Sequence, residues 1–157
     1  RFSKDKTPYK KHFGVFIAKG GKCSGHSGYY FHIEPYHAGY LDGHLMCCGA
    51  YNPESKVIRS IREEFMLNGE ALLKAMNKAE GFEPEWDGAL KRIPKGFPQD
   101  SPYAEYFRLK KVLITRRFDD AFLFKDDLVK RVADLFATCT EFNTILNRAI
   151  DFAYEEY

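Results

Sequence analysis

Hydrophobic and polar residues alternate with a period of two through much of the first third of the chain, which is typical of β-strands. Residues 13–18 are apolar on both faces, and this pattern is typical of a buried strand. Residues 28–34 alternate, so His32 and Glu34 share one face of a strand whose other face is apolar. A third strand is predicted over residues 45–51. Three short strands with short connections predict an antiparallel meander.

The period changes to that of a helix after residues 52–53, where Asn suits the N-cap and Pro the first helical position. Gly69 predicts the end of this helix, and a second helix is predicted over residues 70–79. Residues 81–100 are rich in Gly and Pro, so they are predicted to be mostly loop, with a short strand over residues 89–92.

Four more elements are predicted in the last third of the chain. A helix runs from Asp100 to about Leu109, and a strand covers residues 111–118. Another helix opens at residues 126–127, where two aspartates suit its positive end, and a final helix is capped by Thr140. The helix that opens at residues 126–127 is expected to turn one apolar stripe inward: Leu128, Val129, Val132, Leu135 and Phe136. This segregation of strands and helices predicts an α+β fold, with an antiparallel or mixed sheet packed against several helices, mainly on one side.

The composition excludes several classes of partner. The 157 residues suit a single domain over residues 1–157, with enough apolar surface for one core. The charge is nearly balanced, with 24 basic and 22 acidic residues, which argues against a nucleic-acid partner. No stretch approaches the roughly 20 apolar residues of a membrane span, so no membrane partner is expected. Four cysteines without a Cys-x-x-Cys pair predict free thiols in a cytoplasmic protein: Cys23, Cys47, Cys48 and Cys139.

Polar residues that could form a site gather around the second predicted strand. A histidine beside a carboxylate can act as an acid or a base, so His32 and Glu34 are the candidate catalytic residues. Basic side chains could hold a small anion such as a phosphate or a carboxylate. The candidate ligand-binding residues are Arg1, Lys6, Tyr9, Lys10, Arg92 and Lys95. The alternative is that Glu34 pairs with Arg1 or Arg92 as a structural tie between loop and sheet.

Two other kinds of chemistry have weaker support in the sequence. Seven possible metal ligands lie in a short span: His26, His32, Glu34, His37, His44, Cys47 and Cys48. None of the usual zinc spacings occurs among them, so no metal and no cofactor is predicted. Cys47 or Cys48 beside His44 could form a nucleophile pair, but both cysteines lie in an apolar strand where burial makes a thiol inert. Ser24 and Ser27 lack the strand–turn–helix setting of a nucleophile elbow.

Several blocks of the chain resemble one family. The string Arg-Phe-Ser-Lys-Asp-Lys-Thr-Pro-Tyr-Lys at residues 1–10 is similar to a signature of the bacterial family called domain of unknown function 2461. The resemblance continues at residues 28–35 and 90–97, whereas residues 36–38 replace a stretch that is Gly-rich in the family. It implies a helical segment before the motif, so we expect residues 1–157 to lack such a segment. The family has no assigned reaction, so the resemblance implies no mechanism.

Two hypotheses for the function follow from these observations. The first is an enzyme or a small-anion binder that uses the basic cluster around His32 and Glu34. The second is a non-catalytic interaction module in which that cluster is a structural ion-pair network. A deep pocket lined by the cluster would favour the first hypothesis, and a flat exposed apolar helix face would favour the second.

Overall fold

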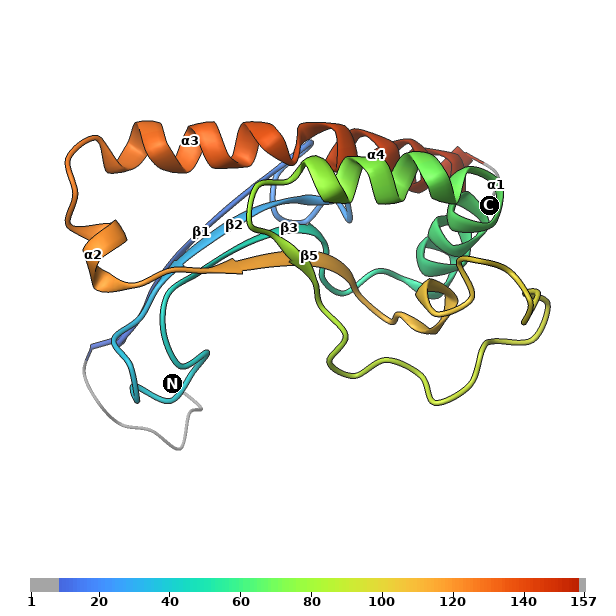
Figure 1. Ribbon diagram of the computed structural model, residues 1–157, viewed down its shortest axis with the longest axis horizontal. Coiled ribbons are helices and arrows are strands. Elements are labelled where there is room, and N and C mark those ends of the chain that lie inside the picture. Colours follow the sequence, from blue (N-terminus) through green and yellow to red (C-terminus); the bar gives the residue numbers. More distant parts are fainter. Residues whose placement is uncertain (1–8, 156–157) are drawn as a thin grey trace.

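Five strands form one antiparallel sheet in the order β1-β2-β3-β5-β4 in the computed structural model, which describes residues 9–155 (Figure 1). Every neighbouring pair of strands is antiparallel. The strands are β1 (Phe13–Ala18), β2 (Gly28–Ile33), β3 (Leu45–Ala50), β4 (Glu83–Pro84) and β5 (Val112–Arg117). The predicted meander is confirmed, because β1, β2 and β3 are consecutive neighbours in the sheet.

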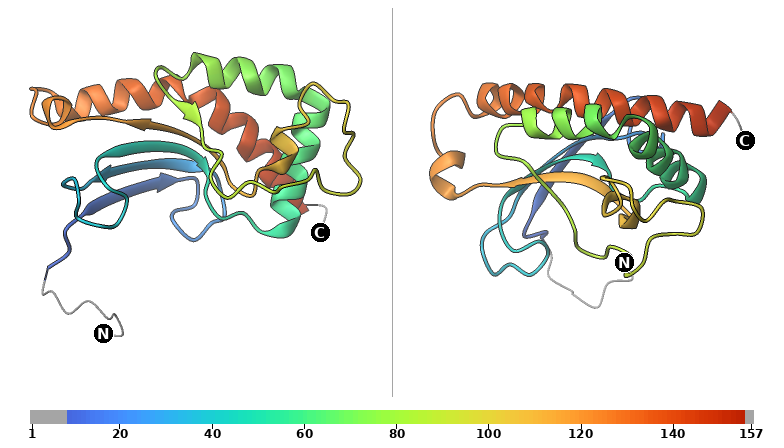
Figure 2. Two further views of the ribbon diagram at one scale, coloured as in Figure 1. Left: turned by 60° about the horizontal axis from the view of Figure 1, so that its bottom comes forward. Right: turned by 45° about the vertical axis from the view of Figure 1, so that its right-hand side comes forward.

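Helices cover one face of this sheet, so the predicted α+β class is confirmed (Figures 1 and 2). The helical elements are α1 (Ser55–Lys78), the 3₁₀-helix η1 (Tyr106–Arg108), α2 (Asp120–Leu123), α3 (Leu128–Thr138) and α4 (Thr140–Glu155). In Figure 1, α3 and α4 follow one another above the strands, and α1 lies beside α4.

The core lies between the helices and one face of the three inner strands. Met46, Cys48 and Ile114 project from the sheet, and each has no exposed surface. Phe65 of α1 and Phe142 of α4 meet them from the helical layer, again without exposed surface. Burying an aromatic side chain of this size contributes roughly 2–3 kcal/mol, so this layer holds the helices on the sheet.

Helix α1 differs from the prediction in its start and agrees with it in its division into two segments. It begins at Ser55 after Glu54, so residues 52–53 do not cap it. The predicted break near Gly69 is present one residue earlier: Asn68 leaves helical geometry (φ −132°), and α1 consists of two helical segments that run in different directions on either side of it (Figure 2). Gly69 has a packing role, because a side chain there would collide with the ring of Tyr103.

The predicted helix from Asp100 to Leu109 is wrong, because only the short η1 forms there. The backbone of this region pairs with another loop instead: Leu90 N–H donates to the carbonyl of Arg108, and Arg108 Nε donates to the carbonyl of Leu90. The predicted strand over residues 89–92 is also wrong, and the short strand in this loop is β4.

Helix α2 was not predicted, since four residues carry too little periodicity to show. It begins after Asp119, whose carboxylate accepts a hydrogen bond from Phe122 N–H as an N-cap. The inner stripe predicted for α3 is wrong in part: Leu135 is buried, but Val129 is 83% exposed.

The prediction that residues 13–18 form a buried strand is right about the strand and wrong about the burial. Strand β1 is at an edge of the sheet, and the helical layer does not extend over it (Figure 2). Phe13 and Ile17 are each 61% exposed, and Val15 and Phe16 are also exposed. The apolar pattern of β1 therefore does not belong to the core.

The four cysteines, all within the described part of the chain, are free thiols. Between residues 9 and 155, no helix is both long enough and apolar enough to cross a membrane.

Candidate functional site

The candidate catalytic pair lies at the end of β2, on the face away from the helices. Phe31 stacks on Phe118 on the helical side of the sheet, and alternation places the next residue, His32, on the other side. Glu34 directly follows β2, and the connection formed by residues 35–44 folds back towards it. As a result, His32 and Glu34 are both 0% exposed.

The Glu34 carboxylate accepts three hydrogen bonds from inside the protein. Tyr40 N–H donates to Oε1 over 2.7 Å, and Leu41 N–H donates to Oε2 over 2.6 Å. His32 Nε2 lies 3.1 Å from Oε2. Burial alone raises the pKa of Glu34, but the hydrogen bonds from Leu41, His32 and Tyr40 outweigh it and lower the pKa from 4.5 to about 2. Glu34 is therefore a carboxylate at neutral pH.

His32 has both of its ring nitrogens in use. Because Glu34 is an acceptor, the proton on Nε2 points at its carboxylate, and in a neutral ring Nδ1 then accepts from the Tyr30 hydroxyl 2.9 Å away. The His32 ring is also covered by His12, with ring centroids 5.4 Å apart. Tyr40 stacks on His12 with ring centroids 4.2 Å apart, and its centroid also lies 5.8 Å from that of His32. The cluster of Tyr30, His32 and Glu34, called the polar cluster below, is thus closed from above by aromatic rings.

A second histidine extends the network to the far end of β5. The backbone N–H of Glu34 donates to Nδ1 of His44, so Nε2 of His44 carries the proton and donates to Asp120 over 2.7 Å. His44 is buried and stacks on Phe118, with ring centroids 5.3 Å apart. This arrangement ties the end of β2, the start of β3 and the start of α2 to one another.

The basic residues proposed as ligand-binding residues do not join the polar cluster where the structure describes them. Tyr9 and Lys10 precede β1 and are exposed, and Lys10 makes no ion pair with Glu34. Arg92 and Lys95 are exposed on the loop between β4 and η1, which lies at the other end of the molecule from the β2–β3 connection (Figures 1 and 2).

The expected ion pair between Glu34 and Arg92 is therefore not formed. Within residues 9–155 the acceptor sites of Glu34 are filled by His32 and two backbone N–H groups, with no Lys or Arg side chain. Arg1 and Lys6, the other partners proposed for Glu34, lie outside the described residues.

The remaining sequence candidates are scattered through the fold. His26 pairs with Asp151 of α4 at 2.7 Å, and His37 is exposed beside Asp42. No group of three or more His, Cys, Asp or Glu side chains in residues 9–155 is arranged to hold a metal ion. Burial raises the pKa of both Cys47 and Cys48, which opposes a role as a nucleophile.

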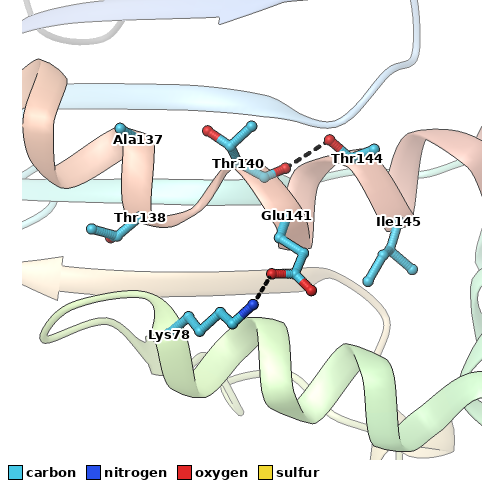
Figure 3. A pocket seen from close by; sticks show the side chains of 7 residues that line it. All are labelled: Lys78, Ala137, Thr138, Thr140, Glu141, Thr144 and Ile145. Atoms are coloured by element: carbon cyan, nitrogen blue, oxygen red, sulfur yellow. Dashed lines mark hydrogen bonds and ion pairs between the residues drawn. The ribbon is translucent and has the colours of Figure 1, made fainter.

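A shallow pocket occurs far from the polar cluster, where the end of α1 meets the junction of α3 and α4 (Figure 3). Its lining contains none of the candidate catalytic, ligand-binding or metal-binding residues. Lys78 and Glu141 pair across it, and the Thr144 hydroxyl donates to the carbonyl of Thr140. Both charged groups of the lining are thus paired with each other, and none of the sequence candidates lies there, so we do not take it as the candidate site.

Sequence reasoning missed three members of the network: His12, Tyr40 and Asp120. His12 and Asp120 come from segments at the ends of other strands, and Tyr40 comes from the loop after β2, so no spacing rule connects the three to His32 and Glu34. The turn residues gave one usable signal: Gly39 and Gly43 mark a bend in the connection, and both adopt positive φ (91° and 115°) there.

The fold and the polar cluster define an α+β domain with a buried, self-satisfied polar network and an open sheet edge. The family model described as "Conserved hypothetical protein (DUF2461)" matches residues 1–144, and the chain belongs to this family. No curated protein and no solved structure matches the chain.

Proposed function

We propose that the protein is a non-catalytic interaction module, in which the polar cluster stabilises the sheet and the β2–β3 connection. The observation that supports this proposal is the internal use of every side-chain hydrogen-bonding atom of His32 and Glu34. A catalytic acid or base has to come within hydrogen-bond reach of a substrate atom. Neither residue has exposed surface from which to do so.

The cluster has the character of a structural device. Two of the three hydrogen bonds to Glu34 come from the ten-residue connection and hold it in place. Buried charges are costly unless they are satisfied in this way. Among the described residues, backbone N–H groups take the place that was expected for Arg92. The cluster therefore stabilises the end of β2 without offering a place for a ligand.

Exposed apolar surface, which an interaction module needs, gathers on β1. We expected it on a helix face, but the large exposed apolar side chains of the helices are dispersed, as Leu67 and Val129 show. Four of the six residues of β1 are large, apolar and exposed. Phe13, Val15 and Ile17 share one face of the strand, and Phe16 is on the other. Exposed apolar side chains gathered in this way mark an interaction site on many soluble proteins.

The experiment that tests this proposal asks whether the polar cluster binds an anion or has only a structural role. Inorganic phosphate is titrated into the wild type and into Glu34→Gln, and the thermal midpoint Tm is measured at constant ionic strength. A ligand at 100 times its Kd stabilises a folded protein by about 2.7 kcal/mol, so a specific site would raise Tm clearly. We expect the variant to have a lower Tm than the wild type and phosphate to change neither. A phosphate-dependent rise in Tm that only the wild type shows would overturn the proposal.

One observation favours a second candidate, an enzyme that acts through Tyr30. Tyr30 is half-buried, and its hydroxyl, His32 and Glu34 form a line of hydrogen bonds in which a carboxylate orients an imidazole towards a hydroxyl. However, burial raises the pKa of Tyr30, which opposes formation of a phenolate. An activated hydroxyl would react with a phenol-directed acylating reagent faster than Tyr9, whereas a structural one would react more slowly.

We also propose a cytoplasmic location in a bacterium. The four free cysteines support a reducing compartment, since two of them are exposed or half-buried and could otherwise oxidise. Cell fractionation with an antibody against the chain tests this proposal, and recovery from a secreted or periplasmic fraction would contradict it.

A further inference from the structure

Strand β1 is an open edge with apolar side chains on both of its faces. It pairs with β2 on one side, and among residues 9–155 no strand pairs with its other side. Its six residues, Phe-Gly-Val-Phe-Ile-Ala, include no charge and no proline. An unpaired edge presents backbone N–H and C=O groups that can hydrogen-bond to another extended chain.

The opposite edge of the same sheet is protected in the usual ways. Strand β4 has only two residues, of which one is the charged Glu83 and the other is Pro84. Short length, charge and proline all prevent a further strand from adding to an edge. Because β1 has none of these features, its open edge calls for an explanation that the fold alone does not supply.

Lysines lie at both ends of β1 and define which chain could add to it. Lys10 and Lys11 precede the strand, and both are exposed. Lys19 and Lys22 follow it; Lys19 pairs with Asp151 at 2.7 Å, whereas Lys22 is exposed and forms no ion pair. The edge is therefore apolar in the middle and positive at each end, more strongly so at its N-terminal end.

This charge pattern excludes a second copy of the chain as the favoured occupant. Antiparallel pairing of two β1 strands would place Lys10 and Lys11 of one copy beside Lys19 and Lys22 of the other. Parallel pairing would place each lysine beside its own equivalent. Like charges directly opposite one another destabilise a strand pair in either orientation.

We propose that β1 binds an extended segment of another protein, apolar in its middle and acidic at both ends, which adds to the sheet as a further strand. This inference rests on the proposed function as an interaction module and gives that module a partner of defined chemistry. Backbone hydrogen bonds along β1 and contacts with Phe13 and Ile17 provide the affinity. Lysine–carboxylate pairs at the two ends set the preference for an acidic segment.

Three fluorescein-labelled peptides with the same alternating Val/Thr centre test the proposal against the full chain. Their ends carry glutamate, serine or lysine, and binding is followed by fluorescence anisotropy. Several exposed charge pairs together predict roughly tenfold tighter binding of the glutamate peptide than of the lysine peptide at low salt. The difference shrinks at high salt, because exposed charges are screened.

Four variants locate the binding on β1. Ile17→Lys places a charge on the edge and is expected to remove binding of the glutamate peptide. Leu67→Lys is the matched control, because Leu67 is similarly exposed (73%) but lies on α1. We expect this variant to bind the glutamate peptide as tightly as the wild type does. Reversing Lys10 and Lys11 together to Glu reverses the preference between the peptides, and Lys22→Glu has a smaller effect. Equal urea midpoints of the Lys variants and the wild type show that each remains folded.

The possible outcomes separate this inference from the proposed function. Equal affinity for the glutamate and serine peptides would overturn the inference that the partner is acidic, although it would leave β1 as a binding site. A wild-type dimer that Ile17→Lys dissociates would overturn it in favour of self-pairing. Binding of no peptide by a monomeric wild type would overturn the docking site on β1 altogether. The phosphate titration of the polar cluster is unaffected by any of these results, so it tests the proposed function independently.

Discussion

The imidazole of His32 and the carboxylate of Glu34 meet at 3.1 Å with no exposed surface on either side chain. The two residues are neighbours on one strand face, and alternation alone brings them together. The loop that carries Tyr40 and Leu41 shields both side chains from solvent, and the backbone N–H groups of these two residues donate to the same carboxylate. A His–Glu pair of the kind found in acid–base sites thereby holds the β2–β3 connection in place.

The pH dependence of stability follows from the pKa of Glu34. Its folded value of about 2 is below the ordinary value of 4.5, so the stabilisation is fully present above about pH 5. It is lost as the pH falls towards 2, because protonation of the carboxylate breaks its hydrogen bonds. We expect Glu34→Gln to have a lower urea midpoint than the wild type at pH 6, and the two midpoints to converge by about pH 2.

The control for this experiment is Glu70→Gln, since Glu70 is exposed on α1. Its midpoint is expected to follow that of the wild type across the whole pH range. A constant difference between wild type and Glu34→Gln from pH 6 to pH 2 would show that ionisation of Glu34 does not contribute to stability.

The core contact between α1 and η1 gives the second prediction. The ring of Phe65 has no exposed surface and stacks on Tyr106, with centroids 4.9 Å apart. Phe65→Ala removes this packing and leaves a cavity, so the free energy of unfolding should fall by about 3–5 kcal/mol. Leu67→Ala, two residues further along the same helix but exposed, should change it by less than about 0.5 kcal/mol. Urea denaturation measures both, and similar losses would contradict the assignment of Phe65 to the core.

The third prediction concerns Gly49, the last residue but one of β3. Its φ of +133° is one that L-residues rarely adopt, and a Cβ there would collide with the carbonyl oxygen of Val112 on β5. Gly49→Ala should therefore combine backbone strain with overpacking and cost roughly 2–5 kcal/mol. Gly39 also has positive φ (+91°), but it faces open space, so Gly39→Ala should cost only the strain. Equal effects on the urea midpoint would show that the close approach of β5 is unimportant.

The fourth prediction is the order in which the thiols react. Cys23 is exposed, and Cys48 and Cys139 are buried, so a thiol reagent should modify Cys23 first under native conditions. Cys47 should react slowly, since burial raises its pKa. Four thiols should be counted in denaturant. Cys23→Ser should remove the fast phase alone, and a fast phase that persists in this variant would contradict the order.

Local pattern was sufficient for most strands and for the later helices. Alternation located β2 and the face that His32 and Glu34 share, and Asp and Thr residues at helix starts located α3 and α4. These features depend on interactions between residues a few positions apart, which the sequence displays directly. The same reasoning failed between residues 100 and 109, where hydrogen bonds with the loop around Leu90 replaced a helix.

The amino-acid sequence by itself determined the α+β class, the meander and the pairing of His32 with Glu34, because each follows from periodicity along the chain. The tertiary structure decided which of the apolar strands is buried and what Glu34 binds. The apolar run at residues 13–18 reads like a core strand, yet only its position at the sheet edge makes it a surface. Likewise, Glu34 was expected to pair with Arg1 or Arg92, but among residues 9–155 the return of the chain at Tyr40 brings two backbone N–H groups to it instead. The first outcome depends on how strands distant in sequence are ordered in the sheet. The second depends on how a loop only six residues away folds back, and periodicity does not encode a loop conformation.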